Sequence, residues 1–108
     1  MSDRVIHQAE IHLPQTTLRK IVHIIGRAGQ APALRAALRD LESATRQEAG
    51  NVSFTLFQAL SSDDHFLLIE DFLSENELER HVQLPHTRAF FALNLVERIE
   101  TVAKDWLS

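Results

Sequence analysis

The chain is 108 residues long, which suits a single domain, and its 44% hydrophobic and 24% charged residues are typical of a globular protein. The formal net charge is −4 and the lysines and arginines are scattered, which argues against nucleic acids and anionic membranes as partners. The absence of cysteine excludes disulfides, thiolate catalysis and cysteine-bound iron–sulfur or zinc sites.

No stretch is apolar over the length of a membrane span, and residues 1–15 lack the apolar core of a signal peptide. We therefore expect a cytoplasmic protein. We divide it into a polar N-terminal arm at residues 1–17 and one folded domain at residues 18–108.

The first predicted element is a strand from Leu18 to Ile25 that is apolar on both faces. Gly26 and Gly29 interrupt it, and Pro32 suits the first turn of a helix that ends before Gly50. Apolar residues at helical spacing predict the buried face of this helix: Leu34, Ala37, Leu38, Leu41 and Ala44.

The middle of the chain predicts a β-hairpin. Val52 to Leu60 alternates apolar and polar residues, Ser61 to Asp64 supplies a turn, and His65 to Phe72 forms the next strand. We expect these two strands to pair with each other.

A second helix is predicted from its start signals. Ser74 and Glu77 form an S-x-x-E capping box, flanked by Leu73 and Leu78 at the positions of a hydrophobic staple. Pro85 interrupts the helical pattern.

After the proline we expect a short helical segment from about His86 to Leu93, a last strand from Val96 to Ala103, and Trp106 packed near the end. The order strand, helix, strand, strand, helix, strand predicts a ferredoxin-like βαββαβ domain of the α+β class with an antiparallel sheet. Two helices cover one face of such a sheet, and the apolar second face requires another cover. We therefore expect a homodimer closed sheet to sheet.

Local signatures follow one another in a set order along the chain. They are a turn with Gly29, the tripeptide Glu48-Ala49-Gly50, and the run Ile69-Glu70-Asp71-Phe72 followed by His81 and Pro85-His86. With these signatures, residues 20–103 resemble the antibiotic biosynthesis monooxygenase family. The resemblance implies a dimeric α/β barrel with a pocket between sheet and helices. It implies several possible chemistries, among them oxygenation without metal or flavin, haem degradation and isomerisation of small metabolites.

Two departures from the family pattern argue against haem. Haem-degrading members carry an asparagine on the first strand and a tryptophan at the end of the third strand. This sequence has no asparagine between Leu18 and Ile25, has Phe72 at the tryptophan position, and contains no tyrosine. We expect no cofactor.

Oxygenation without a cofactor requires a base near neutrality in an apolar pocket, because loss of a proton makes the substrate electron-rich. Histidine is the natural candidate. His81 follows Glu77 by one helical turn, so Glu77 could orient its ring, and the pair is either catalytic or structural. His86 follows Pro85 and either caps backbone amides or lines the mouth of the pocket.

Glu70 shares an apolar strand face with Phe66 and Leu68, which makes it either an oriented base or the partner of an arginine such as Arg80 or Arg98. His23 lies between Ile21 and Ile25 in the strand alternation, as a hydrogen-bonded core histidine or a substrate contact. Four phenylalanines are both core residues and candidate walls of the pocket: Phe54, Phe72, Phe90 and Phe91.

No metal site is expected, because His81 and His86 are five residues apart with a proline between them and no cluster of carboxylates is near in sequence.

The leading hypothesis is a cofactor-independent monooxygenase of a small quinol or phenolic compound. Its catalytic candidates are His81, His86 and Glu70. One alternative is an isomerase of a small polar metabolite, which an anion bound near His23, Arg27 and His86 would favour. Another alternative is a non-catalytic dimer that binds a small molecule.

Overall fold

The computed structural model of the protein describes residues 17–102. The elements are β1 (Leu18–Gly26), α2 (Ala31–Thr45), β2 (Asn51–Gln58), β3 (His65–Phe72), α3 (Glu75–Gln83), α4 (Pro85–Ala92) and β4 (Val96–Thr101). The predicted arm and the expected packing of Trp106 lie outside the described residues.

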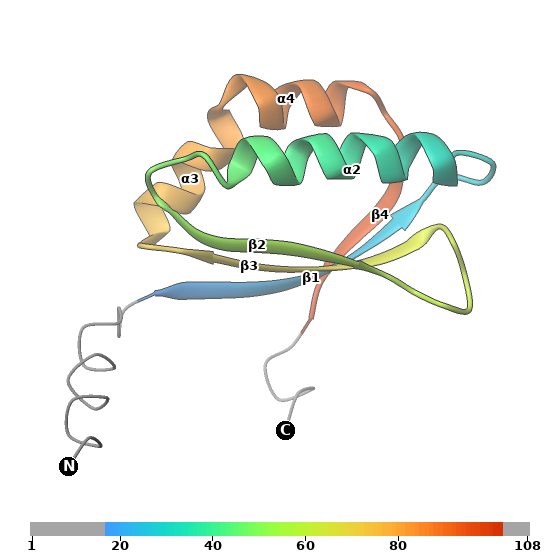
Figure 1. Cartoon of the computed structure of the whole chain (residues 1–108), viewed down its shortest axis with the longest axis horizontal. Helices are drawn as coiled ribbons and strands as arrows, with labels where there is room; N and C mark the ends of the chain where they lie inside the picture. The colour runs from blue at the N-terminus through green and yellow to red at the C-terminus, as the bar shows by residue number, and fades with distance from the viewer. Residues whose placement is uncertain (1–16, 103–108) are drawn as a thin grey trace, which may run out of the picture.

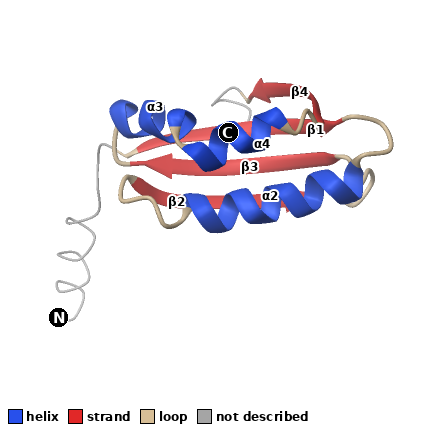
Figure 2. Ribbon diagram, turned by 90° about the horizontal axis from the view of Figure 1, so that it is seen from above, coloured by secondary structure: helices blue, strands red, loops and turns tan. Residues whose placement is uncertain are grey.

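The four strands form one antiparallel sheet in the order β2-β3-β1-β4. All three helices lie on the same face of this sheet (Figures 1 and 2). The predicted ferredoxin-like α+β fold is confirmed. The second helical segment is divided into α3 and α4, as the proline predicted.

The sequence explains where the helices begin and end. The side chain of Ser74 accepts a hydrogen bond of 3.3 Å from the backbone N–H of Glu77, which is the N-cap half of the predicted capping box. Leu84 is extended, at φ −70° and ψ 152°, as expected for a residue before proline. The chain therefore changes direction at Leu84–Pro85, so that α3 and α4 approach the sheet from different angles.

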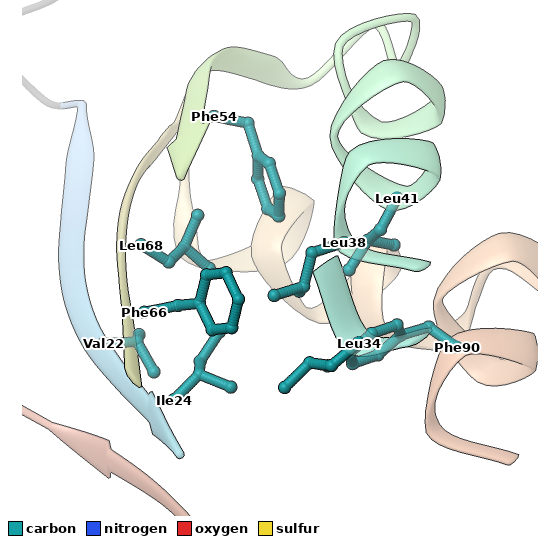
Figure 3. Close-up of a cluster of buried hydrophobic side chains, with 9 residues drawn as sticks. All are labelled: Val22, Ile24, Leu34, Leu38, Leu41, Phe54, Phe66, Leu68 and Phe90. Carbon is teal, nitrogen blue, oxygen red and sulfur yellow. The ribbon is translucent and has the colours of Figure 1, made fainter. Parts of the chain in front are cut away.

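The hydrophobic core lies between the sheet and the helices (Figure 3). The strands and helices that face each other contribute its buried side chains: Val22, Ile24, Leu34, Leu38, Leu41, Phe54, Phe66, Leu68 and Phe90. Phe54 is only 1% exposed. Burial of these side chains is the main stabilising contribution that positions the sheet under the helices.

The opposite face of the sheet, which we call the outer face, is covered by none of the helices of residues 17–102 (Figure 1). Ile69, Leu67 and Phe57 belong to this face, because their strand neighbours point into the core. Phe57 is 50% exposed. Among residues 17–102, no helix has the length and apolar character needed to cross a membrane.

Candidate functional site

A cavity of about 330 Å³ lies between the sheet and helices α3 and α4. Its walls are mainly apolar and come from all four strands and all three helices, with Val22, Leu41, Phe54, Leu68, Phe91 and Ile99 among them. Six polar side chains also border it: Lys20, Glu70, Glu79, His81, Thr87 and Thr101. An apolar cavity with a few convergent polar groups is the usual form of a small-molecule site.

His81 is held in place by a buried carboxylate. Its Nδ1 lies 2.8 Å from Oε2 of Glu48, and the two side chains are only 6% and 9% exposed. An ionised carboxylate can only accept, so Nδ1 is the donating nitrogen, and in the neutral form of the ring the lone pair is on Nε2. The ring packs at 5.0 Å from the ring of Phe72 and at 5.7 Å from that of Phe54.

The second ring nitrogen of His81, Nε2, has no hydrogen-bond partner among residues 17–102. Across the described part of the chain, the one buried side-chain nitrogen or oxygen without a hydrogen-bond partner is Oγ1 of Thr45. Nε2 of His81 also lacks a hydrogen-bond partner among residues 17–102, but it is not one of the fully buried atoms without a partner. We infer that this nitrogen is partly accessible. Because His81 borders the cavity, a ring held at Nδ1 by a carboxylate can act as a base through Nε2.

Glu48 belongs to the tight turn between α2 and β2, where its backbone N–H donates to the carbonyl of Thr45. Its Oε2 also accepts from Nε2 of His86, at 2.5 Å. His81 comes from α3 and His86 from α4, so the change of direction at Leu84–Pro85 brings both rings to one carboxylate oxygen.

The expectation that Glu77 orients His81 is wrong. Glu77 is directed at Gly50, where an added Cβ would lie 2.7 Å from the Cβ of Glu77. A side chain at position 50 would therefore clash with Glu77, which explains the glycine. Glu77 packs against Gly50 and forms no hydrogen bond with His81. Glu48, which is 33 positions from His81 in the sequence, takes the orienting place.

Glu70 borders the same cavity from the centre of the sheet. It pairs with Lys20 on β1 and with Phe54 on β2 in the strand register, and it is 7% exposed. Within residues 17–102 its side chain forms no hydrogen bond or ion pair, and the predicted pairing with Arg80 or Arg98 does not occur. Arg98 instead forms an ion pair with Glu100.

Burial raises the pKa of Glu70 from 4.5 to about 7, and the positive charge of Lys20 opposes part of that effect. Glu70 can therefore exist in both protonation states near neutral pH. A carboxylic acid of this kind at the edge of a cavity can donate or accept a proton.

The remaining candidates are divided among different places. Phe54 and Phe91 border the cavity, whereas Phe72 lies behind His81 and Phe90 belongs to the core. His23 lies on the other side of the sheet, in a separate groove where its ring is 5.3 Å from that of His65.

The three residues near which a bound anion would have favoured the isomerase alternative lie in different places. Arg27 binds the carbonyl and side chain of Asn94 and a carboxylate oxygen of Glu97. His86 contacts Glu48, and His23 is in the groove of the outer face. The structure therefore does not assemble the site that would have favoured a phosphorylated metabolite.

Sequence reasoning missed Lys20 and Thr87 as cavity residues and gave Glu48 no role of its own. A signal for Glu48 was present, because the tripeptide Glu48-Ala49-Gly50 is one of the family signatures. Three residues of metal-ligand type were also missed, because they are far apart in the sequence. One ligand atom each from Glu48, His81 and His86 lies within 4.8 Å of the others.

Comparison with known proteins gives consistent results. The sequence pattern of the family described as antibiotic biosynthesis monooxygenase matches residues 17–93. None of the curated proteins compared with the chain gives a significant match. Among solved structures, the protein PA3566 from Pseudomonas aeruginosa is 31% identical, with a TM-score of 0.78 over 82% of this chain and 92% of that one.

Two further solved structures share the fold at lower identity. One, described as a putative antibiotic biosynthesis monooxygenase from Nitrosomonas europaea, is 19% identical, with a TM-score of 0.73 over 80% of this chain and 86% of that one. Rv0793 from Mycobacterium tuberculosis is 26% identical, with a TM-score of 0.70 over 82% of this chain and 94% of that one.

Proposed function

The chain belongs to the antibiotic biosynthesis monooxygenase family, and on this premise we propose that it oxidises a small phenolic or quinol compound with O₂, without metal or flavin. One observation carries the proposal. Nδ1 of His81 is bound to the largely buried Glu48 carboxylate, while the ring borders an apolar cavity and Nε2 has no hydrogen-bond partner among residues 17–102. A base held in this way is the group that cofactor-free oxygenation requires.

In the proposed reaction the substrate hydroxyl gives its proton to Nε2 of His81, and the resulting phenolate is electron-rich enough to reduce O₂. A bond forms between oxygen and a ring carbon that carries hydrogen, which is opposite the phenolate oxygen in a phenol and next to the phenolate carbon in a quinol. The O–O bond then breaks, the hydrogen on that carbon and the proton held by His81 leave with the outer oxygen as water, and a quinone remains. Glu48 stabilises the imidazolium that exists between the two proton transfers.

The other polar groups have complementary roles in this proposal. The ammonium group of Lys20 stabilises the phenolate, and the protonated form of Glu70 donates a hydrogen bond to an oxygen of the substrate. Phe54 and Phe91 supply flat apolar surface for an aromatic ring.

The test is oxygen uptake by purified protein, in the presence of a chelator and without flavin, against a panel of naphthols, anthrols and quinols. We expect uptake with a quinone product, and loss of uptake in His81→Gln. Uptake that needs added flavin, or that His81→Gln retains, would contradict the proposal.

A second candidate is an isomerase, because two proton-transfer groups, His81 and Glu70, border one cavity. Such a pair can remove a proton on one side of a carbonyl compound and return one at another position. Turnover of a keto compound under nitrogen, without oxygen uptake, would favour this function over oxygenation. Tight binding of a ligand with no turnover in either assay would favour the non-catalytic dimer.

We also propose that two copies pack through their outer faces as a homodimer. The support is that Ile69, Leu67 and the half-exposed Phe57 lie on a face that none of the described helices α2, α3 and α4 covers. The cytoplasmic location and the division at residue 17 stay predictions from the sequence.

A further inference from the structure

We propose that Glu48, His81 and His86 form a binding site for one divalent transition-metal ion such as Zn²⁺, and that the bound ion switches off the base. The binding part stands on the geometry alone. The inhibitory part rests on the proposed function of His81.

Three ligand atoms of suitable type converge at this place. Oε2 of Glu48 lies 2.8 Å from Nδ1 of His81 and 2.5 Å from Nε2 of His86, and one ligand atom of each residue lies within 4.8 Å of the others. Two zinc–nitrogen bonds of about 2.1 Å hold their nitrogens no more than about 4.2 Å apart. Side-chain movements of less than an ångström therefore bring all three atoms onto one ion.

The chemistry of the set selects the kind of ion. Two imidazoles and one carboxylate suit Zn²⁺, Co²⁺ or Fe²⁺, whereas Mg²⁺ and Ca²⁺ prefer sites built of oxygen atoms. The carboxylate of Glu48 is 9% exposed, and within residues 17–102 no lysine or arginine forms an ion pair with it. A cation at this place would therefore neutralise a buried negative charge.

The site also has a path for the ion and room for a further ligand. The side chain of His86 is 29% exposed, so the set is accessible from solvent on the α4 side. Three protein ligands leave at least one position for water.

Metal binding would change what His81 presents to the cavity. An ion on Nδ1 replaces the proton there, so the neutral ring has to carry its proton on Nε2. Nε2 then donates instead of accepting and cannot take a proton from the substrate. The ion would inhibit from behind the base without entering the cavity.

The test uses untagged, full-length, chelator-treated protein in which His7 and His12 are replaced by alanine, so that the arm offers no imidazole. Zn²⁺ binding is measured by calorimetry, and Co²⁺ binding by its visible absorption, which reports coordination number. We expect one ion per chain, bound at least about 10-fold more weakly by each of Glu48→Gln, His81→Gln and His86→Gln. His86→Gln alters the most exposed of the three ligands and so remains informative if a buried variant fails to fold.

The matched control is the double variant His23→Gln, His65→Gln, which removes two adjacent histidines on the outer face. It should bind as tightly as its parent. No binding, equal binding by the three ligand variants, or loss of binding in the outer-face variant would each overturn the site.

If oxygen uptake is found, Zn²⁺ should abolish it with a midpoint at the calorimetric Kd, and uptake unaffected by bound Zn²⁺ would overturn the inhibitory part. If no uptake is found, the proposed function fails while the binding data still decide the site.

Discussion

Nδ1 of His81 lies 2.8 Å from Oε2 of Glu48, although the two residues are 33 positions apart. This contact joins the turn after α2 to helix α3, and the ring that it holds borders the cavity. An orienting carboxylate of this kind acts through the base and touches no substrate itself, so Glu48 is a positioning residue.

Glu48→Gln keeps the shape of the side chain and removes its charge. We expect kcat for oxygen uptake to fall about 10²-fold with little change in KM, because the imidazolium loses its electrostatic partner. Glu48→Asp should recover part of the loss. Glu77→Gln is the matched control, because Glu77 packs on Gly50 and not on His81. Equal kcat values for Glu48→Gln and the unmodified protein would refute the positioning role.

The two histidines that share Glu48 should differ in their effects. His81 borders the cavity and His86 does not, so His81→Gln should lower kcat by roughly 10²-fold to 10⁴-fold and His86→Gln by less than about 10-fold. The measurement is steady-state oxygen uptake after far-UV circular dichroism has shown that both variants are folded. A larger loss in His86→Gln than in His81→Gln would reverse the assignment.

Glu70 should make stability depend on pH. Since folding raises its pKa from 4.5 to about 7, the folded state favours the protonated carboxyl. The stabilising contribution is therefore complete below pH about 4.5 and is lost as the pH rises through about 7. Glu70→Gln removes this dependence, so its free energy of unfolding relative to the unmodified protein should rise by on the order of 3 kcal/mol between pH 4 and pH 8.

Urea unfolding at a series of pH values measures this difference. Asp40→Asn is the control, because Asp40 is exposed on α2 and its replacement should give no comparable trend. A difference between Glu70→Gln and the unmodified protein that stays constant with pH would show that Glu70 ionises normally in the folded protein.

Substitutions of the two phenylalanines that border the cavity should have different effects, one on stability and the other on substrate binding. Phe54 is 1% exposed, so Phe54→Ala should lower the free energy of unfolding by about 3–5 kcal/mol. Phe91 is 52% exposed, so Phe91→Ala should cost less than about 1 kcal/mol and mainly raise KM. Urea unfolding and steady-state kinetics test the pair, and a KM unchanged in Phe91→Ala would remove Phe91 from the substrate contacts.

A single charge substitution on the outer face can test the proposed association of two copies. Phe57 is half-exposed on that face, so Phe57→Asp should convert a dimer to a monomer at micromolar protein in light scattering. Leu93→Asp, which replaces an exposed residue at the end of α4, should leave the mass unchanged. A monomeric mass for the unmodified, folded protein would contradict the dimer at once.

The elements of the fold and the faces of its strands and helices are readable from local sequence patterns. The proline at the start of α2, the Ser74 cap and the Leu84–Pro85 break act within one turn of chain, and strand alternation alone placed Glu70 on the same face as Phe66 and Leu68. Predicted boundaries of β3 were met, and β2 ended two residues earlier than expected, at Gln58.

Which polar side chains contact one another could be seen only in the folded chain. Glu48, His81 and His86 come from a turn and two helices, and Lys20 and Glu70 come from neighbouring strands, so their contacts depend on how α3 and α4 pack on the sheet. The sequence offered Glu77 as the partner of His81, because i,i+4 spacing is visible along a chain. Close packing against Gly50 engaged Glu77 elsewhere and left that place to Glu48. Local preferences are readable from neighbours in sequence, whereas a site assembled from distant segments depends on packing between side chains that the sequence does not place together.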